Sequence, residues 1–136
     1  MGFLDRKKLL TREKLEIVRV DVGDGDWVYV RQMTGRERDQ FERSLFDVTD
    51  DNQPQRRLEN FRSKLAVSTI CDEQGVLLFT MKDVDALSDS ISARRLEMIV
   101  SKAQQLNKIT EEDKEKLVKN SEGGPAASFS SDSVEN

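Results

Sequence analysis

The sequence predicts an α+β protein, mainly α-helical, in which an N-terminal β-hairpin packs on four to five short helices. Two observations carry this prediction. β-Branched and aromatic residues alternate on both sides of Gly23-Asp24-Gly25, and an Asp-Gly pair supplies the positive φ angles of a tight reversal. After position 34, cap signals precede apolar residues spaced three and four apart, as in amphipathic helices.

Composition and charge divide the chain into three segments. Residues 1–14 form a basic N-terminal arm, in which leucines could anchor a short helix. Residues 15–120 hold the hairpin and the helices as one domain, which suits a chain of 136 residues. The last stretch, residues 121–136, reads SEGGPAASFSSDSVEN and contains too little apolar surface to offset ordering, so we expect a flexible polar tail.

The hairpin arms are residues 17–22 and 27–30, and the first helix is expected over residues 35–46. Thr34-Gly35-Arg36-Glu37 has the spacing of a capping box, in which the Thr hydroxyl and the Glu carboxylate each accept from a backbone amide at the helix start. Pro54 is well tolerated at a first helical position and opens a second helix, expected over residues 54–68.

The second half of the chain alternates turns with further helices. Residues 71–75 predict a turn, and the apolar run 76–79 fits either a third strand or an extended segment laid on the helices. Thr80 caps the next helix, and residues 88–92 interrupt it and supply the cap of the following one. That following helix, with Leu96, Ile99, Val100, Ala103 and Leu106 on one face, is the best patterned and is expected to be the longest. Thr110 caps a last short helix.

The residue inventory argues against an enzyme. The chain has no histidine, the commonest general base and transition-metal ligand, and no phosphate-binding glycine motif or paired CxxC. Its one cysteine, Cys71, has no activating base, and neighbouring Asp72 and Glu73 would raise its pKa. Asp24 and its neighbours lack the twelfth-position Glu of a calcium loop, so they are read as turn residues. We expect no cofactor and no metal.

The charge balance argues against nucleic acid as a partner. A net charge of -4 from 26 acidic and 22 basic residues provides no concentrated basic surface to displace counterions. No segment is long or apolar enough for a signal peptide or a membrane span, so we expect no membrane association and a cytoplasmic location. With 36% hydrophobic and 35% charged residues and a mean hydropathy of -0.65, the chain either completes its burial against another chain or forms a small helical domain alone.

One face of the hairpin is the leading candidate for an interaction surface. Strand periodicity places Trp27 and Tyr29 on one side, where they face either the core or a partner. Apolar stripes on the helices are the second candidate. A small and polar domain can leave part of such stripes uncovered by its own core, and this part is then available to a partner. The candidate partner-binding residues are Trp27, Tyr29, Phe41, Leu96, Ile99 and Val100.

Three segments resemble the tail assembly chaperones of long-tailed bacteriophages and prophages. They are GDGDWVYVRQMTGRERDQFE, LAVSTICDEQGVLLFTMKDVDAL, and a helix end reading AQQLN. The matching features are a hairpin that leads into a TGRER-type helix start, the segment CDEQGVLLFT followed by DVxxL, and the AxxLN end of the long helix. The resemblance covers residues 15 to about 120.

The resemblance implies a non-enzymatic protein of the host cell cytoplasm. Such chaperones coat the tape measure protein, keep it soluble and help recruit tail tube protein subunits. We also expect copies of this chain to associate with one another. Many are also made in a longer form by ribosomal frameshifting. The alternative is a structural phage subunit, either a head-tail connector or a tail terminator, that stays in the virion. A small nucleic-acid-binding regulator is the third class and fits the acidic balance least.

Overall fold

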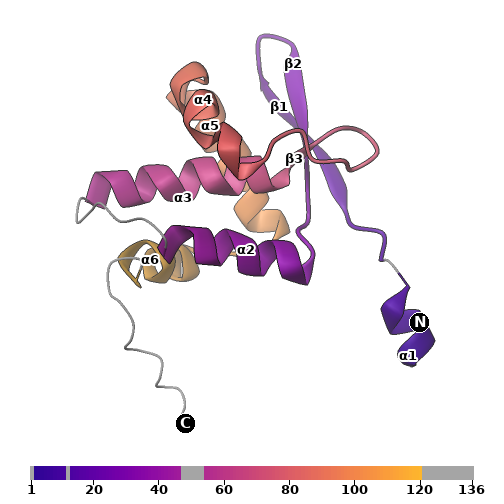
Figure 1. Cartoon of the computed structure of the whole chain (residues 1–136). Helices are drawn as coiled ribbons and strands as arrows, with labels where there is room; N and C mark the ends of the chain where they lie inside the picture. Colours follow the sequence, from indigo (N-terminus) through magenta and orange to yellow (C-terminus); the bar gives the residue numbers. More distant parts are fainter. Residues whose placement is uncertain (1, 12, 47–53, 121–136) are drawn as a thin grey trace.

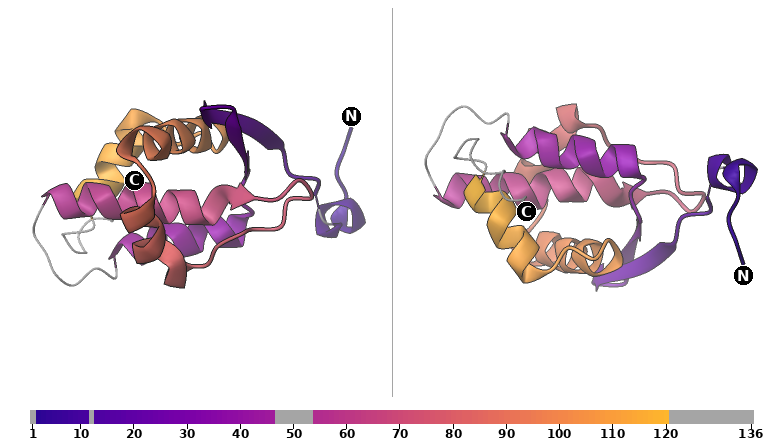
Figure 2. Two further views of the ribbon diagram at one scale, coloured as in Figure 1. Left: turned by 90° about the horizontal axis from the view of Figure 1, so that it is seen from above. Right: turned by 90° about the horizontal axis from the view of Figure 1, so that it is seen from below.

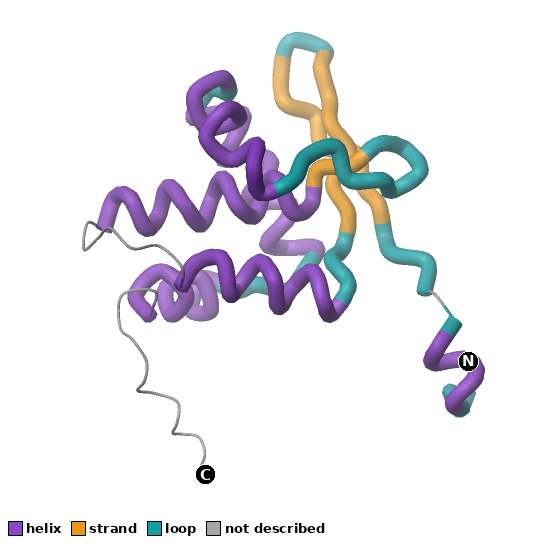
Figure 3. Tube along the Cα trace, in the orientation of Figure 1, coloured by secondary structure: helices purple, strands orange, loops and turns teal. Residues whose placement is uncertain are grey.

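The computed structural model describes residues 2–11, 13–46 and 54–120 (Figure 1). Strands β1 (Ile17–Gly23), β2 (Asp26–Arg31) and β3 (Ile70–Cys71) form an antiparallel sheet in the order β1-β2-β3. The helices, apart from α1, lie to one side of the hairpin (Figure 3). The prediction of a mainly helical α+β fold with an N-terminal hairpin is confirmed, and the short third strand that was one option for residues 76–79 is present at Ile70–Cys71 instead.

The hairpin reverses through two residues with positive φ. Asp24 has φ 59° and Gly25 has φ 80°, the conformation that a two-residue turn needs to match the twist of its strands. Valines oppose each other along the ladder, with Val18 opposite Val30 and Val20 opposite Val28. These valines form the inner face of the sheet, which meets the helices.

The helices predicted after Thr34 and Thr110 begin directly after these residues, Pro54 opens a helix as predicted, and Thr80 caps a 3-10 turn that continues into a helix. Their bounds are α1 (Arg6–Leu10), α2 (Gly35–Phe46), α3 (Pro54–Thr69), α4 (Val84–Ser90), α5 (Ala93–Leu106) and α6 (Glu111–Asn120), with a 3-10 turn η1 (Met81–Asp83) leading into α4. The Glu37 amide donates to Thr34 Oγ1 at 3.1 Å, and the Thr34 amide donates to Glu37 Oε1 at 2.9 Å. Reciprocal pairs of this kind also open η1 and α6. The longest helix is α3, with 16 residues against 14 for α5, so that detail of the prediction was wrong.

The third strand is Ile70–Cys71, directly after α3. Ile70 and Cys71 pair with Val30 and Tyr29 of β2. The chain then reverses, because the carboxylate of Asp72 accepts from the amides of Gln74 and Val76 at 2.8 and 3.0 Å. The returning segment, residues 76–79, contributes only an isolated bridge from Leu77 to Cys71, which favours the second sequence interpretation, an extended segment.

The core lies between the inner face of the sheet and helices α2, α3, α5 and α6. Phe41 of α2 and Phe61 of α3 meet edge to face, with ring centroids 5.8 Å apart. Helix α5 packs on both α3 and the hairpin, and α6 packs on α3 and α2 (Figure 2). The buried hydrophobic cluster comprises Val20, Val22, Val30, Met33, Phe41, Leu45, Phe61, Leu65, Ala66, Ile70, Ile99, Val100, Ala103 and Ile109.

The two ends of the chain differ in what the structure describes. The N-terminal arm contains the short helix α1, which has no buried residue and stands away from the rest of the fold (Figure 1). The tail predicted for residues 121–136 lies outside the described residues. No helix in the described part of the chain is long and apolar enough to cross a membrane.

Candidate protein-interaction site

The face of the sheet that points away from the helices is the main candidate site. Residues paired across an antiparallel ladder share a face, so three pairs from β1 and β2 line this outer face. They are Ile17 with Arg31, Arg19 with Tyr29, and Asp21 with Trp27.

Trp27 lies on the surface and not in the core. Its side chain is 46% exposed, and the guanidinium carbon of Arg19 lies 4.0 Å from the ring centroid. Arg19 Nε in turn donates to Asp21 Oδ1 at 3.0 Å. Tyr29, two residues along the strand, is half-buried. The indole is therefore held by a cation on one side of the ring while much of its surface faces solvent.

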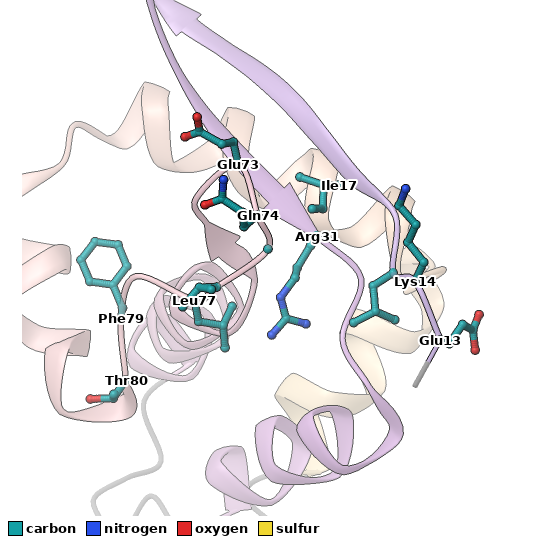
Figure 4. Close-up of a pocket in the computed structure, with 12 residues that line it drawn as sticks. Glu13, Lys14, Ile17, Arg31, Glu73, Gln74, Leu77, Phe79 and Thr80 are labelled. Carbon is teal, nitrogen blue, oxygen red and sulfur yellow. The ribbon is translucent and has the colours of Figure 1, made fainter. Parts of the chain in front are cut away.

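A cavity of ≈ 790 Å³ opens at the other end of the outer face (Figure 4). Arg31 points into it from β2, between Ile17 of β1 and the segment that carries Leu77 and Phe79. The turn at Gly75 lies close against Ile17: a Cβ atom built on Gly75 would be only 3.2 Å from Ile17 Cδ1. The outer face is thus open around Trp27 and walled around Arg31.

Arg31 is the buried charge of this site. Its two terminal nitrogens donate to the two carboxylate oxygens of Glu37, each at 2.9 Å, and Nη1 also donates to the Gln32 carbonyl at 2.8 Å. The hydrogen bonds from Arg31 hold the pKa of Glu37 below its usual range, and Glu37 raises the pKa of Arg31. The pair neutralises the charge and ties the end of β2 to the first turn of α2.

Cys71 and the hairpin acids have structural roles. The pKa of the Cys71 thiol is raised mainly by burial, and the charge of Asp72 adds to this effect. The sequence had suggested only the effect of the neighbouring acidic charges.

At the hairpin tip, Arg95 of α5 donates to Asp26 Oδ2 at 2.8 Å and to the Gly23 carbonyl at 3.1 Å. Within the described ranges, no group of three or more Cys, Asp or Glu side chains could hold a metal ion.

The six predicted partner-binding residues fall into two groups. Phe41, Ile99 and Val100 belong to the core, because helices α2 and α5 turn their apolar stripes inward, and their side chains offer no surface to a partner in the folded chain. Leu96 is half-buried and packs against the core. Only Trp27 and Tyr29 come together on the outer face.

Exposed apolar residues after β3 were not singled out in the sequence. Val76, Leu78 and Met81 all have exposed side chains, and Val76 also lines the cavity beside Arg31. The feature of the sequence that could have indicated this exposed surface is the apolar run 76–79, which lies between two turns in a polar sequence. An extended segment with single pairing leaves alternate side chains facing out, so part of such a run is exposed.

Asn107 is a further residue that the sequence reasoning quoted without giving it a role. It ends the AxxLN motif, and its side-chain oxygen accepts from the Met33 amide at 2.8 Å. Arg38, at the end of the TGRER motif, donates to the Asn107 carbonyl at 3.3 Å. The two quoted motifs therefore meet where the hairpin passes into α2, and they hold that junction against the end of α5.

Comparison with known proteins gives one informative result. No protein-family model and no curated protein matches the sequence. Among solved structures, the tail assembly chaperone of bacteriophage HK97 matches with a TM-score of 0.51 and 17% identity, over 74% of this chain and 95% of that chain. The chain therefore has the fold of a bacteriophage tail assembly chaperone, in agreement with the sequence resemblance.

Proposed function

We propose that this chain is a phage tail assembly chaperone that binds the tape measure protein, keeps it soluble and helps recruit tail tube subunits in the host cytoplasm. The observation that carries the proposal is the likeness in fold, which extends over 95% of the HK97 chaperone. The described residues offer no metal cluster, and no motif in the sequence suggests catalysis, so a binding role suits them best.

The outer face of the sheet provides the contact with the tape measure protein. Amphipathic helices are recognised through their apolar stripes by aromatic and aliphatic anchors on a complementary surface, and we propose that the tape measure protein presents such a helix to this face. Trp27 is the natural anchor, since a large, half-exposed indole held by Arg19 loses little side-chain entropy on binding. Asp21 and Arg19 beside it supply polar contacts at the rim.

Co-expression with the tape measure protein of the same phage tests the proposal. The soluble fraction of tape measure protein is compared with no chaperone, the unchanged chain, Trp27→Ala and Phe46→Ala. Phe46 is the matched control, because it is 48% exposed against 46% for Trp27 but lies at the end of α2. We expect the unchanged chain and Phe46→Ala to raise the soluble fraction of tape measure protein, and Trp27→Ala to leave it close to the value without the chain.

Two outcomes count against this proposal. If the tape measure protein is equally soluble with and without the chain, the chaperone function is wrong. If Trp27→Ala solubilises as well as Phe46→Ala, the function stands but the outer face is not the contact. Mass spectrometry of purified virions separates a chaperone, which is absent from the particle, from a structural subunit, which is present in regular copy number.

A further inference from the structure

Strand β1 has a free edge, because it is the outer strand of the sheet and pairs only with β2. The Gln32 amide donates to the Glu16 carbonyl at 3.0 Å, so hydrogen-bonded positions alternate along β1 from Glu16 onward. The backbone amides and carbonyls of the intervening residues point away from β2; these residues are Ile17, Arg19 and Asp21. No other segment of the described chain forms a backbone hydrogen bond with them. Such an edge can pair with a further strand.

The flank of helix α5 beside this edge carries a row of three side chains. Arg94, Met98 and Lys102 follow one another at intervals of four residues, so they lie along one side of the helix. The Arg94 guanidinium lies against Gly23 at the end of β1, and its Nη1 is 3.9 Å from the Met98 sulfur. A different side of α5, that of Glu97, pairs with α3. The row therefore faces away from α3 and toward the β1 edge.

The two cations of this row have no acidic partner. In the described part of the chain, neither Arg94 nor Lys102 forms an ion pair with a carboxylate. The adjacent Arg95, by contrast, pairs with Asp26 at 2.8 Å. Met98, between the two cations, is 37% exposed. The flank thus offers a cation, an apolar side chain and a second cation in sequence.

The spacing of the row matches that of an extended strand. Four residues of an α-helix rise about 6 Å, and alternate residues of a strand are about 6.8 Å apart. Every second side chain of a strand added to β1 therefore faces one member of the row. Acidic side chains complement Arg94 and Lys102, and an apolar side chain complements Met98.

We propose that the free edge of β1 binds an extended segment of a partner protein by strand addition. The segment has an acidic, an apolar and an acidic residue at alternate positions. The β1 backbone supplies the hydrogen bonds, and the α5 row selects the side chains. This site does not rest on the function proposed above, because it is an edge of the sheet and takes a strand, whereas the outer face is proposed to take a helix.

A synthetic peptide tests the edge on the full chain. The probe is Thr-Glu-Thr-Val-Thr-Glu-Thr, blocked at both ends, in which the two Glu side chains and the Val side chain share one face. Its matched control has Lys in place of both Glu residues. Amide hydrogen exchange measured by NMR reports on each residue of β1. Val18 and Val20 are internal controls, because their amides already bond to β2.

The expected result is protection of the edge amides alone. In the chain without peptide, the amides of Ile17, Arg19 and Asp21 should exchange faster than those of Val18 and Val20. The acidic peptide should slow the exchange of the three edge amides, because it supplies carbonyl acceptors for them. The Lys peptide should leave their exchange unchanged, because it places cations against the basic row.

Charge reversal on α5 tests the selection of side chains. In Arg94→Glu with Lys102→Glu, the acidic peptide should bind at least about tenfold more weakly, because two ion pairs at exposed positions are lost. The Lys peptide should then protect the edge in its place. The matched control, Lys7→Glu with Lys8→Glu, makes the same change of charge on the arm and should bind the acidic peptide like the unchanged chain. Circular dichroism checks the fold of each variant.

Three results would overturn the proposal. If the edge amides are already as protected as Val18 and Val20 in the chain alone, the chain's own tail or a second copy fills the edge. If the acidic peptide leaves their exchange unchanged, the edge does not take such a strand. If the Lys peptide protects the unchanged chain equally well, the α5 row does not select the ligand. None of these results alters the co-expression test of chaperone function.

Discussion

The two faces of the hairpin differ in how far their side chains are buried. On the inner face, Val20 and Val30 are buried under α5 and belong to the core. On the outer face, Arg19 and Trp27 stack on each other and remain in contact with solvent. Strand alternation produces both faces, but only the packing of helices on one side makes them different. The inner face therefore contributes to stability, and the outer face is the one we propose for recognition.

The outer face is itself divided by Arg31. Around Trp27 it is open, whereas around Arg31 the turn at Gly75 and the segment after β3 wall it in. The bidentate pair with Glu37 makes this end part of the folded framework. Three substitutions compare residues that hold the fold together with Trp27 on the proposed recognition surface. They are given in descending order of expected effect on stability.

Phe41→Ala should have the largest effect. The ring is fully buried and packs edge to face on Phe61, so its removal leaves a cavity in the core. We expect the free energy of unfolding to fall by about 3–5 kcal/mol, measured by urea denaturation. A loss below about 1 kcal/mol would show that Phe41 is not a core residue and would return it to the set of candidate contacts.

Glu37→Gln should have an intermediate effect that depends on pH. Glu37 has its pKa lowered in the folded state, so its contribution is present above the unfolded value of 4.5 and is lost as pH falls through the folded pKa. We expect the variant to be about 1–3 kcal/mol less stable than the unchanged chain at pH 7. Denaturation at a series of pH values should show this gap closing below about pH 5.

Glu42→Gln is the control for that experiment. Glu42 pairs with Arg38 at 2.8 Å in the same helix, but on a more exposed site. We expect it to cost about 0.3–0.5 kcal/mol. An equal cost for the two substitutions would mean that the buried pair with Arg31 does not contribute more than a surface pair.

Trp27→Ala should change stability least of the three test substitutions. It removes the contact with Arg19, worth about 0.5–1 kcal/mol at an exposed site, from a side chain that is 46% exposed. We expect a loss of no more than about 1 kcal/mol with an unchanged denaturant slope, measured by urea denaturation. If the free energy of unfolding fell as much as in Phe41→Ala, the indole would be part of the folded core, and the two faces would not differ in the way described.

Much of the fold follows from local signals in the sequence. The Asp24-Gly25 turn and the caps at Thr34, Thr80 and Thr110 act through residues adjacent in the chain, so their geometry could be predicted without tertiary contacts. The third strand was harder to place. Ile70 becomes a strand residue because it meets Val30 of the hairpin, a contact between segments far apart in sequence.

The candidate site was less predictable than the fold. Periodicity identified the apolar stripes that include Phe41 and Ile99, but a buried stripe and an exposed one have the same pattern in sequence. The exposed position of Trp27 depends on helices covering the other side of the sheet. Likewise, nothing local joins Asn107 to Met33, since their contact spans two motifs that only the packing of α5 brings together.

The sequence by itself determined the hairpin turn and the starting points of the capped helices, because turns and caps act over a few neighbouring residues. The tertiary structure decided which face of the hairpin is covered, that Arg31 and Glu37 close one end of the outer face, and that the arm carries exposed apolar residues. The physical reason is that burial depends on segments distant in the chain. Whether an apolar residue stabilises the fold or remains available to a partner is settled only when those segments pack.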